Sequence, residues 1–394
     1  MNRIVYFLIA LGMSGLAACD ITDNEVEPGV SFVQIYDDRS FAADYDPLDV
    51  VQTEDGGYLS LAATNAWNIY LFQTDTDGQF AWENKVNEAY VNPLEKLIRL
   101  GDQHYVFAMN EVTLATVAIP AGSGGEADSS FTEINEVQYP LDVVVTPDES
   151  LLILGYNRES RSSTLHKLDA NFNVIWSEEY AVEEDMEEEI IRHLSRTGRR
   201  LPFFVGYTED QRSYYFNGLA NYTLGLNFVN PQDGALTGTL QGYQDDEFVS
   251  AALHLGDNQY ALARNGFGVS TLLPRTEVDN QGIASSTELV ANDFPEIDFN
   301  ARIIVKEVEL IGRSVVVYGT HTKKRQIILY AYDKESGTLL GTKYLGQTKP
   351  YQLGNFVATE DGGLTVLAET FLAGRFSRPC LFKLSPEEFT DFTQ

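Results

Sequence analysis

Basic residues recur at one kind of position between residues 158 and 378, in the turns that join the predicted second and third strands of consecutive units. Nine of the 27 Lys and Arg residues lie there: Arg158, Arg161, Arg212, Arg264, Lys323, Lys324, Arg325, Arg375 and Arg378. Aromatic residues such as Tyr156, Tyr207 and Phe371 accompany them. Guanidinium groups suit the forked geometry of carboxylates and phosphates, so these turns predict a surface for an anionic ligand. The candidate ligand-binding residues are Arg158, Arg161, Arg212, Arg264, Lys323, Arg325 and Arg375. The alternative is that exposed turns simply carry charged side chains for solvation.

A second set of candidates is acidic. Asp49, Glu95 and Asp142 occupy one position of a repeat in three consecutive units, and Ser250 and Asn355 stand at equivalent positions. Adjacent carboxylates that face a channel can hold a cation, or act as the acid and base that cleave a glycosidic bond. The alternative is that they accept hydrogen bonds from backbone N–H groups where strands begin.

Histidine and cysteine offer little for catalysis. His321, the one histidine predicted in a loop, is a candidate base for a polysaccharide lyase. Cys380 lies in an apolar run and is interpreted as a small buried hydrophobe. The His and Cys residues show no metal-ligand spacing, and no nucleophile elbow, phosphate loop or dinucleotide motif occurs. The sequence therefore predicts no catalytic residue, no metal site and no cofactor.

Short strands and tight turns must position these residues, and residues 48–86 show the pattern. Apolar runs at 48–51, 58–63, 69–72 and 80–82 are separated by polar turns, two of which contain Asp-Gly, at 55–56 and 77–78. Asp and Gly tolerate the positive φ that hairpin turns require. This stretch therefore predicts four strands in one antiparallel sheet.

The same unit recurs along the chain. Asp75 and Trp82 reappear 94 residues later as Asp169 and Trp176, which is two periods of 47, and the turn at 53–57 returns letter for letter at 359–363. Seven second strands follow from this repeat: 58–63, 105–108, 151–155, 203–206, 260–263, 315–319 and 364–368. The fourth and sixth units align poorly with the other five. The acidic run at 178–189 and the basic stretch at 192–200 are predicted to form a solvated loop between units that pairs with itself.

Seven four-stranded sheets without helical periodicity predict an all-β fold, a seven-bladed β-propeller. The last unit ends after Leu384 with no room for a fourth strand, whereas residues 30–36 alternate as a strand does. We expect this N-terminal strand to complete the last blade and close the ring. With its Asp-Gly-Gly-Tyr and Leu-Asp turns, the stretch 30–385 resembles the propeller lipoproteins of Bacteroidetes-like bacteria. The resemblance implies the fold and says little about activity.

The first residues predict a location. A short positive start and an apolar run at 4–13 precede Leu16-Ala17-Ala18-Cys19, which resembles the lipobox of bacterial lipoproteins. The resemblance implies a signal peptide at 1–18, acylation of Cys19, an acidic flexible tether at 19–29 and a single propeller domain at 30–394. An ordinary secretory signal is the alternative. The acidic tether resembles the surface-export signal of Bacteroidetes lipoproteins, so we expect a lipid anchor in the bacterial envelope, at the outer membrane and exposed on its surface. In enterobacteria, Asp20 beside the cysteine would instead mean retention at the inner membrane.

Charge narrows the function classes. With 58 acidic and 27 basic residues the net charge is −31, which disfavours binding to nucleic acid. The leading hypothesis is a non-catalytic, membrane-anchored module that binds or scaffolds an envelope protein complex or binds an acidic glycan. The alternative is a glycan-active hydrolase or lyase, with the group Asp49, Glu95 and Asp142, or His321, in the propeller funnel.

Overall fold

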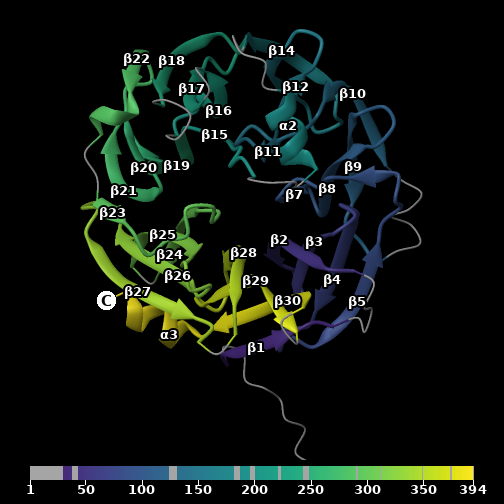
Figure 1. Ribbon diagram of the computed structural model, residues 1–394, viewed down its shortest axis with the longest axis vertical. Coiled ribbons are helices and arrows are strands. Elements are labelled where there is room, and N and C mark those ends of the chain that lie inside the picture. Colours follow the sequence, from purple (N-terminus) through teal and green to yellow (C-terminus); the bar gives the residue numbers. More distant parts are fainter. Residues whose placement is uncertain are drawn as a thin grey trace, which may run out of the picture.

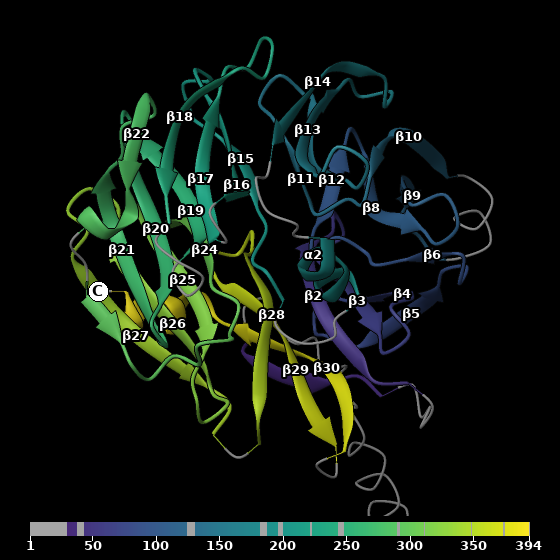
Figure 2. The same cartoon turned by 45° about the horizontal axis from the view of Figure 1, so that its top comes forward.

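The computed structural model describes residues 30–37, 43–123, 131–181, 187–195, 200–220, 223–242, 248–289, 292–310, 312–347, 349–372 and 375–393. Within these residues seven separate sheets stand around a common axis like the blades of a propeller (Figure 1). Figure 2 shows the same ring obliquely, with its top tilted forward. The predicted all-β, seven-bladed propeller is therefore confirmed. Cys19 and the predicted signal peptide lie outside the described residues.

The blades follow one another along the chain. The first contains β2 (Tyr45–Gln52), β3 (Tyr58–Thr64), β4 (Ile69–Thr74) and β5 (Phe80–Lys85). The second contains β6 (Tyr90–Val91), β7 (Leu97–Leu100), β8 (Gln103–Asn110), β9 (Ala115–Pro120) and β10 (Thr132–Gln138). The third contains β11 (Asp142–Val145), β12 (Leu151–Asn157), β13 (Ser162–Leu168) and β14 (Val174–Ala181). The fourth contains β15 (Val205–Tyr207), β16 (Tyr214–Ala220), β17 (Thr223–Val229) and β18 (Leu236–Gln241), with β22 (Gly282–Ser285) parallel to β18.

The remaining three blades complete the ring. The fifth contains β19 (Phe248–Gly256), β20 (Gln259–Gly266), β21 (Val269–Glu277) and β23 (Asn292–Phe294), and the short helix η1 (Ser286–Glu288) precedes β23. The sixth contains β24 (Ile304–Leu310), β25 (Arg313–His321), β26 (Ile327–Asp333) and β27 (Leu339–Leu345). The seventh contains β28 (Tyr351–Ala358), β29 (Leu364–Leu372), β30 (Phe376–Leu384) and β1 (Phe32–Ile35).

The N-terminal strand closes the ring as predicted. β1 pairs antiparallel with β30, so that Phe32 lies opposite Lys383 and Ile35 opposite Cys380. The pairing covers the edge that β30 would otherwise expose. Cys380 is fully buried, which confirms its interpretation as a small hydrophobe. The chain after β30 forms the helix α3 (Pro386–Phe392) instead of the expected short polar end.

The apolar runs of the sequence become the contacts between blades. In the described residues the buried side chains form seven clusters, one between each pair of neighbouring blades. The middle strands of each blade are covered on both faces, so β3, β12 and β26 are buried along almost their whole length. The repeated turns are also alike: Gly56 and Gly362 have φ of +83° and +85°, and each N–H donates to the carbonyl of the threonine three residues earlier.

Two predictions fail around the fourth blade. The run 203–206 was predicted as a second strand, but residues 205–207 form β15, the innermost strand, and the second strand is β16. The predicted solvated loop contains the helix α2 (Glu187–Leu194), which buries Ile190 and Leu194 against the third and fourth blades. Three glutamates in its first turn suit the positive end of the helix dipole. The expected self-pairing does occur, because Arg192 forms ion pairs with Glu188 and Glu189.

Candidate functional site: the loop face and the central channel

One end of the ring carries most of the predicted basic residues. The turns between second and third strands meet the connections between blades at this end, which we call the loop face. Arg158 and Arg161 lie in the β12–β13 turn, and Lys323 and Arg325 in the β25–β26 turn. Arg375 directly precedes β30, and Arg264 lies near the end of β20. Arg212 lies in the β15–β16 turn instead, at the opposite face, because 205–207 is a first strand and not a second one.

Several of these cations are already engaged. The Arg158 Nε atom lies 2.6 Å from a carboxylate oxygen of Glu187 at the start of α2. Arg264 donates to the backbone carbonyl of Ser286. Arg378 is only 1% exposed, pairs with Asp37 at 2.8 Å and lies over the ring of Tyr45. Arg378 therefore stabilises the contact between the seventh and first blades.

A different arrangement occurs over the sixth and seventh blades. Five exposed cations cluster there, and none forms an ion pair with a residue in the described part of the chain: Lys323, Lys324, Arg325, Lys349 and Arg375. We call this group the basic rim. Two contacts hold its centre in place, since the Arg325 guanidinium lies 5.5 Å from the centre of the Phe371 ring and the Arg325 carbonyl accepts a hydrogen bond from the Tyr351 N–H. Lys349 was missed because it follows a fourth strand.

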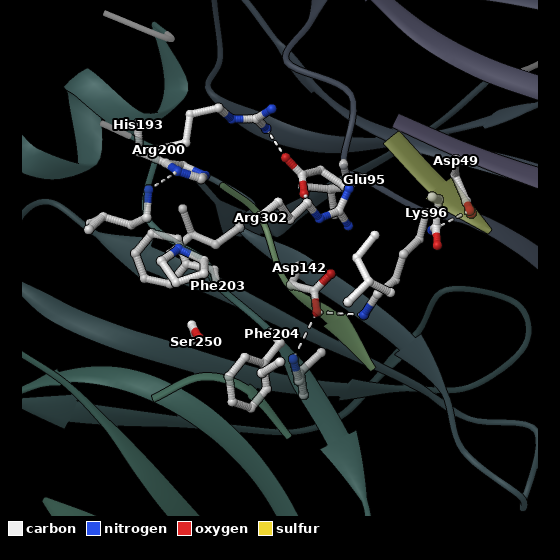
Figure 3. A pocket seen from close by; sticks show the side chains of 18 of the residues that line it. Asp49, Glu95, Lys96, Asp142, His193, Arg200, Phe203, Phe204, Ser250 and Arg302 are labelled. Atoms are coloured by element: carbon white, nitrogen blue, oxygen red, sulfur yellow. Dashed lines mark hydrogen bonds and ion pairs between the residues drawn. The ribbon is translucent and has the colours of Figure 1, made fainter. Parts of the chain in front are cut away.

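The predicted acidic set lies in the central channel, where the first strands of the blades meet (Figure 3). Asp49 Oδ2 accepts from the backbone N–H of Leu97 at 2.6 Å, and Asp49 Oδ1 from the amide of Asn355 at 2.6 Å. Asp142 Oδ2 accepts from the Val205 N–H at 2.8 Å and from Lys96 Nζ at 2.6 Å. Each aspartate therefore joins its own blade to the next, as the backbone alternative predicted. Burial raises the pKa of both carboxyl groups above its usual value.

Glu95 behaves differently from the two aspartates. Its carboxylate lies between Arg200 and Arg302, and the Arg302 Nε atom is 2.8 Å from Glu95 Oε2 (Figure 3). Arg200 also reaches Asp46 at 3.2 Å, and Arg302 donates to the carbonyl of Gly354 at 3.1 Å. Every carboxylate of the predicted set thus has a cation or a backbone N–H as its partner. Arg200 is therefore a channel residue, although its sequence position predicts a solvated surface loop.

The channel opens on the loop face in a mouth cavity of about 560 Å³. Its wall includes Asp46, Glu95, Arg200, Arg302 and His321. The structure corrects the placement of His321, which is the last residue of β25 and only 9% exposed. Burial lowers the pKa of His321 to about 4, so the ring is neutral at pH 7.

Metal and membrane features are limited in the described residues. No group of three or more His, Cys, Asp and Glu side chains is placed there to hold a metal ion. No helix within those ranges is long and apolar enough to cross a membrane.

Comparison with known proteins supports the fold. No family model matches the chain, and no curated protein matches it. The WD40 domain of coronin from Toxoplasma gondii gives a TM-score of 0.52 at 10% identity, over 91% of this chain and 87% of that one. The β-propeller domain of the Trilobed protease from Pyrococcus furiosus gives 0.48 at 12% identity, over 89% and 98%. A protein of unknown function from Bacteroides caccae gives 0.40 at 11% identity, over 82% and 88%. At such identities the similarity shows the propeller fold alone.

Proposed function

We propose that this protein is a non-catalytic binding module that recognises an anionic ligand through the basic rim. One observation carries the proposal: five exposed cations stand together without an ion pair to any described residue, on a chain with a net charge of −31. A local positive patch on an acidic molecule attracts anions and repels cations. Because all five side chains are exposed, the fold requires no counter-charge for them, and they remain available to a ligand.

The rim is also partly preorganised for binding. Stacking on Phe371 and the backbone hydrogen bond to Tyr351 limit the motion of the Arg325 turn. An arginine held in this way loses less conformational entropy when it binds a carboxylate, sulfate or phosphate group. Such groups occur on acidic glycans and on acidic loops of protein partners, the two ligand classes expected from the sequence.

We also propose that the chain is anchored through acylated Cys19 in a bacterial envelope, where it serves as a binding or scaffolding subunit. β1 begins opposite Lys383, near the end of β30 that lies away from the loop face. The eleven residues 19–29 span at most about 40 Å when fully extended. An anchor attached at that end would hold the rim on the side facing away from the membrane, accessible to a partner.

The test compares two variants with equal changes in charge. The rim variant carries Lys323→Ser, Lys324→Ser and Arg375→Ser, and the control carries Arg99→Ser, Arg212→Ser and Arg313→Ser on the opposite face. Both are applied, beside the wild type, to an array of acidic and neutral glycans and to pull-downs from envelope membranes. We expect the rim variant to lose at least about tenfold in affinity for the acidic ligand, and the control to bind like the wild type.

Three outcomes contradict the proposal. The first is equal binding by the rim variant and the wild type at low salt. The second is an equal loss in both variants, which would reflect total charge instead of the rim. The third is that the wild type binds no acidic glycan and captures no envelope protein.

A further inference from the structure

The mouth cavity is a second concave site on the loop face, and its charge differs from that of the basic rim. Its volume of about 560 Å³ falls within the range of small-molecule sites. It lies on the propeller axis, whereas the rim lies over the outer turns of two blades. The two surfaces therefore suit different ligands.

Charges in the cavity wall nearly cancel. Arg200 and Arg302 both pair with Glu95, and Arg200 also pairs with Asp46. Glu369 accepts a hydrogen bond from Gln352 at 2.7 Å, and burial raises its pKa to about 7. His321 is neutral at that pH, as described above. A charged ligand would gain little from this wall and would lose its own hydration, so a neutral ligand is favoured.

His321 is one of two wall residues with a buried polar atom that lacks a hydrogen-bond partner among the described residues; the other is Arg200, at its Nε atom. It is 91% buried, and neither ring nitrogen has a hydrogen-bond partner among the described residues; Nδ1 in particular is closed off from solvent. Its backbone is fixed, because its carbonyl accepts from the Asp298 N–H at 3.1 Å. Nδ1 is out of reach of a ligand, whereas Nε2 also lacks a protein partner but is not closed off from solvent. A ligand in the cavity could therefore form the hydrogen bond that Nε2 lacks.

Most of the other polar side chains of the wall share a planar, forked shape. Carboxylate, guanidinium and amide groups line the rest of the wall. Those of Glu369, Arg200, Gln352 and Asn265 already pair within the protein and can bind a ligand only at their remaining donor or acceptor positions, whereas the exposed Asn300 amide has no partner among the described residues. Phe248 and Phe299 add apolar surface. Neighbouring hydroxyl groups of a sugar donate and accept together, which matches forked groups, and the C–H face of a sugar ring suits an aromatic surface.

We propose that the mouth cavity binds a neutral saccharide unit, with His321 as a hydrogen-bonding residue of the site. This site goes beyond the proposed function, because it does not depend on the basic rim. The proposal concerns binding only, and no bond of the saccharide is broken.

The test titrates the full chain with named sugars by calorimetry and saturation-transfer NMR. The neutral probes are glucose, galactose, mannose, N-acetylglucosamine, maltose, cellobiose and lactose, and the acidic probes are glucuronate and galacturonate. We expect at least one neutral sugar to bind, and His321→Ala to weaken it at least about tenfold. His166→Ala is the matched control, since His166 is also buried, at 4% exposed, has an unpartnered Nε2 atom and lies outside the cavity wall.

Further variants separate the possible outcomes. Asn300→Ala changes an exposed residue of the wall and tests the site even when His321→Ala fails to fold. The rim variant described above should bind the neutral sugar like the wild type. The proposal is overturned when no neutral sugar binds, when only the uronates bind, or when folded His321→Ala and Asn300→Ala both keep the wild-type affinity.

Discussion

The central channel and the basic rim contain the same kinds of cation in opposite situations. In the channel, Arg200 and Arg302 pair with Glu95, Lys96 pairs with Asp142, and Lys306 donates to the carbonyl of Phe356 at 2.6 Å. On the rim, no cation has an ion-pair partner within the described ranges. The two regions differ because charges that are largely withdrawn from water, as in the channel, must be compensated, and exposed charges need not be.

This difference assigns the channel charges to the stability of the ring and the rim charges to the recognition of a ligand. The channel groups link blades that are far apart in sequence, so they are expected to contribute to folding. Exposed charges contribute little to stability. Cations on the rim can therefore be selected for ligand binding at small cost to the stability of the fold. The comparison predicts large stability effects in the channel and small ones on the rim.

Removal of Glu95 should have the largest effect. Glu95→Ala leaves Arg200 without its main partner and frees Arg302 Nε, and we expect a loss of about 3 kcal/mol in the free energy of unfolding. This is the low end for a buried pair, because the Glu95 side chain is 23% exposed. Urea unfolding measures it.

Glu54→Ala is the matched control for this change, since Glu54 pairs with Arg99 at the surface and its side chain is 75% exposed. We expect that variant to lie within about 0.5 kcal/mol of the wild type. Equal losses in the two variants would remove the distinction between channel and surface.

A smaller loss is expected at Asp49. Asp49→Ala leaves the Leu97 N–H and the Asn355 amide without their acceptor, which should cost about 2 kcal/mol. Asp49→Asn keeps one acceptor oxygen and removes a buried charge, so it should lose less. A wild-type unfolding midpoint in Asp49→Ala would show that these bonds between blades do not stabilise the ring.

The sequence predicts the fold well because the repeat has a local chemical cause. Asp-Gly turns and short apolar runs recur with each blade, and the final unit is one strand short, which leads directly to closure by β1. The innermost carboxylates were also found at equivalent positions. Their roles were left open, since a repeat position does not say which backbone group comes within reach.

The rest depends on contacts that no local pattern marks. The run 203–206 is as short and apolar as a second strand, and the insertion with α2 disrupts the spacing that would separate first from second strands. Arg212 was therefore assigned to the wrong face. Arg200 looks like a surface residue in sequence, and only the folded ring brings it beside Glu95.

Acidity offers a subtler test of the cavity wall at the channel mouth. The pKa of Glu369 is raised from 4.5 to about 7, so its protonated form favours the folded state. The resulting stability is fully present below pH 4.5 and is lost as the pH rises toward 7. His321, with its lowered pKa, acts in the opposite sense and loses stability as the pH falls from 6.5 to 4.

Because the two trends oppose each other, Glu369→Gln is needed to isolate one of them. The free energy of unfolding of the wild type relative to this variant should fall between pH 4.5 and 7.5. Urea unfolding at several pH values measures the difference. A constant difference across that range would mean that Glu369 does not titrate there.

The smallest effect on stability is expected on the rim itself. The variant with Lys323→Ser, Lys324→Ser and Arg375→Ser should unfold within about 0.5 kcal/mol of the wild type, although it removes three charges. It takes the net charge from −31 to −34, so any loss should come from general repulsion and disappear as salt rises from about 0.02 to 0.5 M. Urea unfolding at both salt concentrations checks this. A loss above about 1.5 kcal/mol that salt does not reduce would mean that the rim cations have structural partners, and the basis for assigning them to a ligand would be gone.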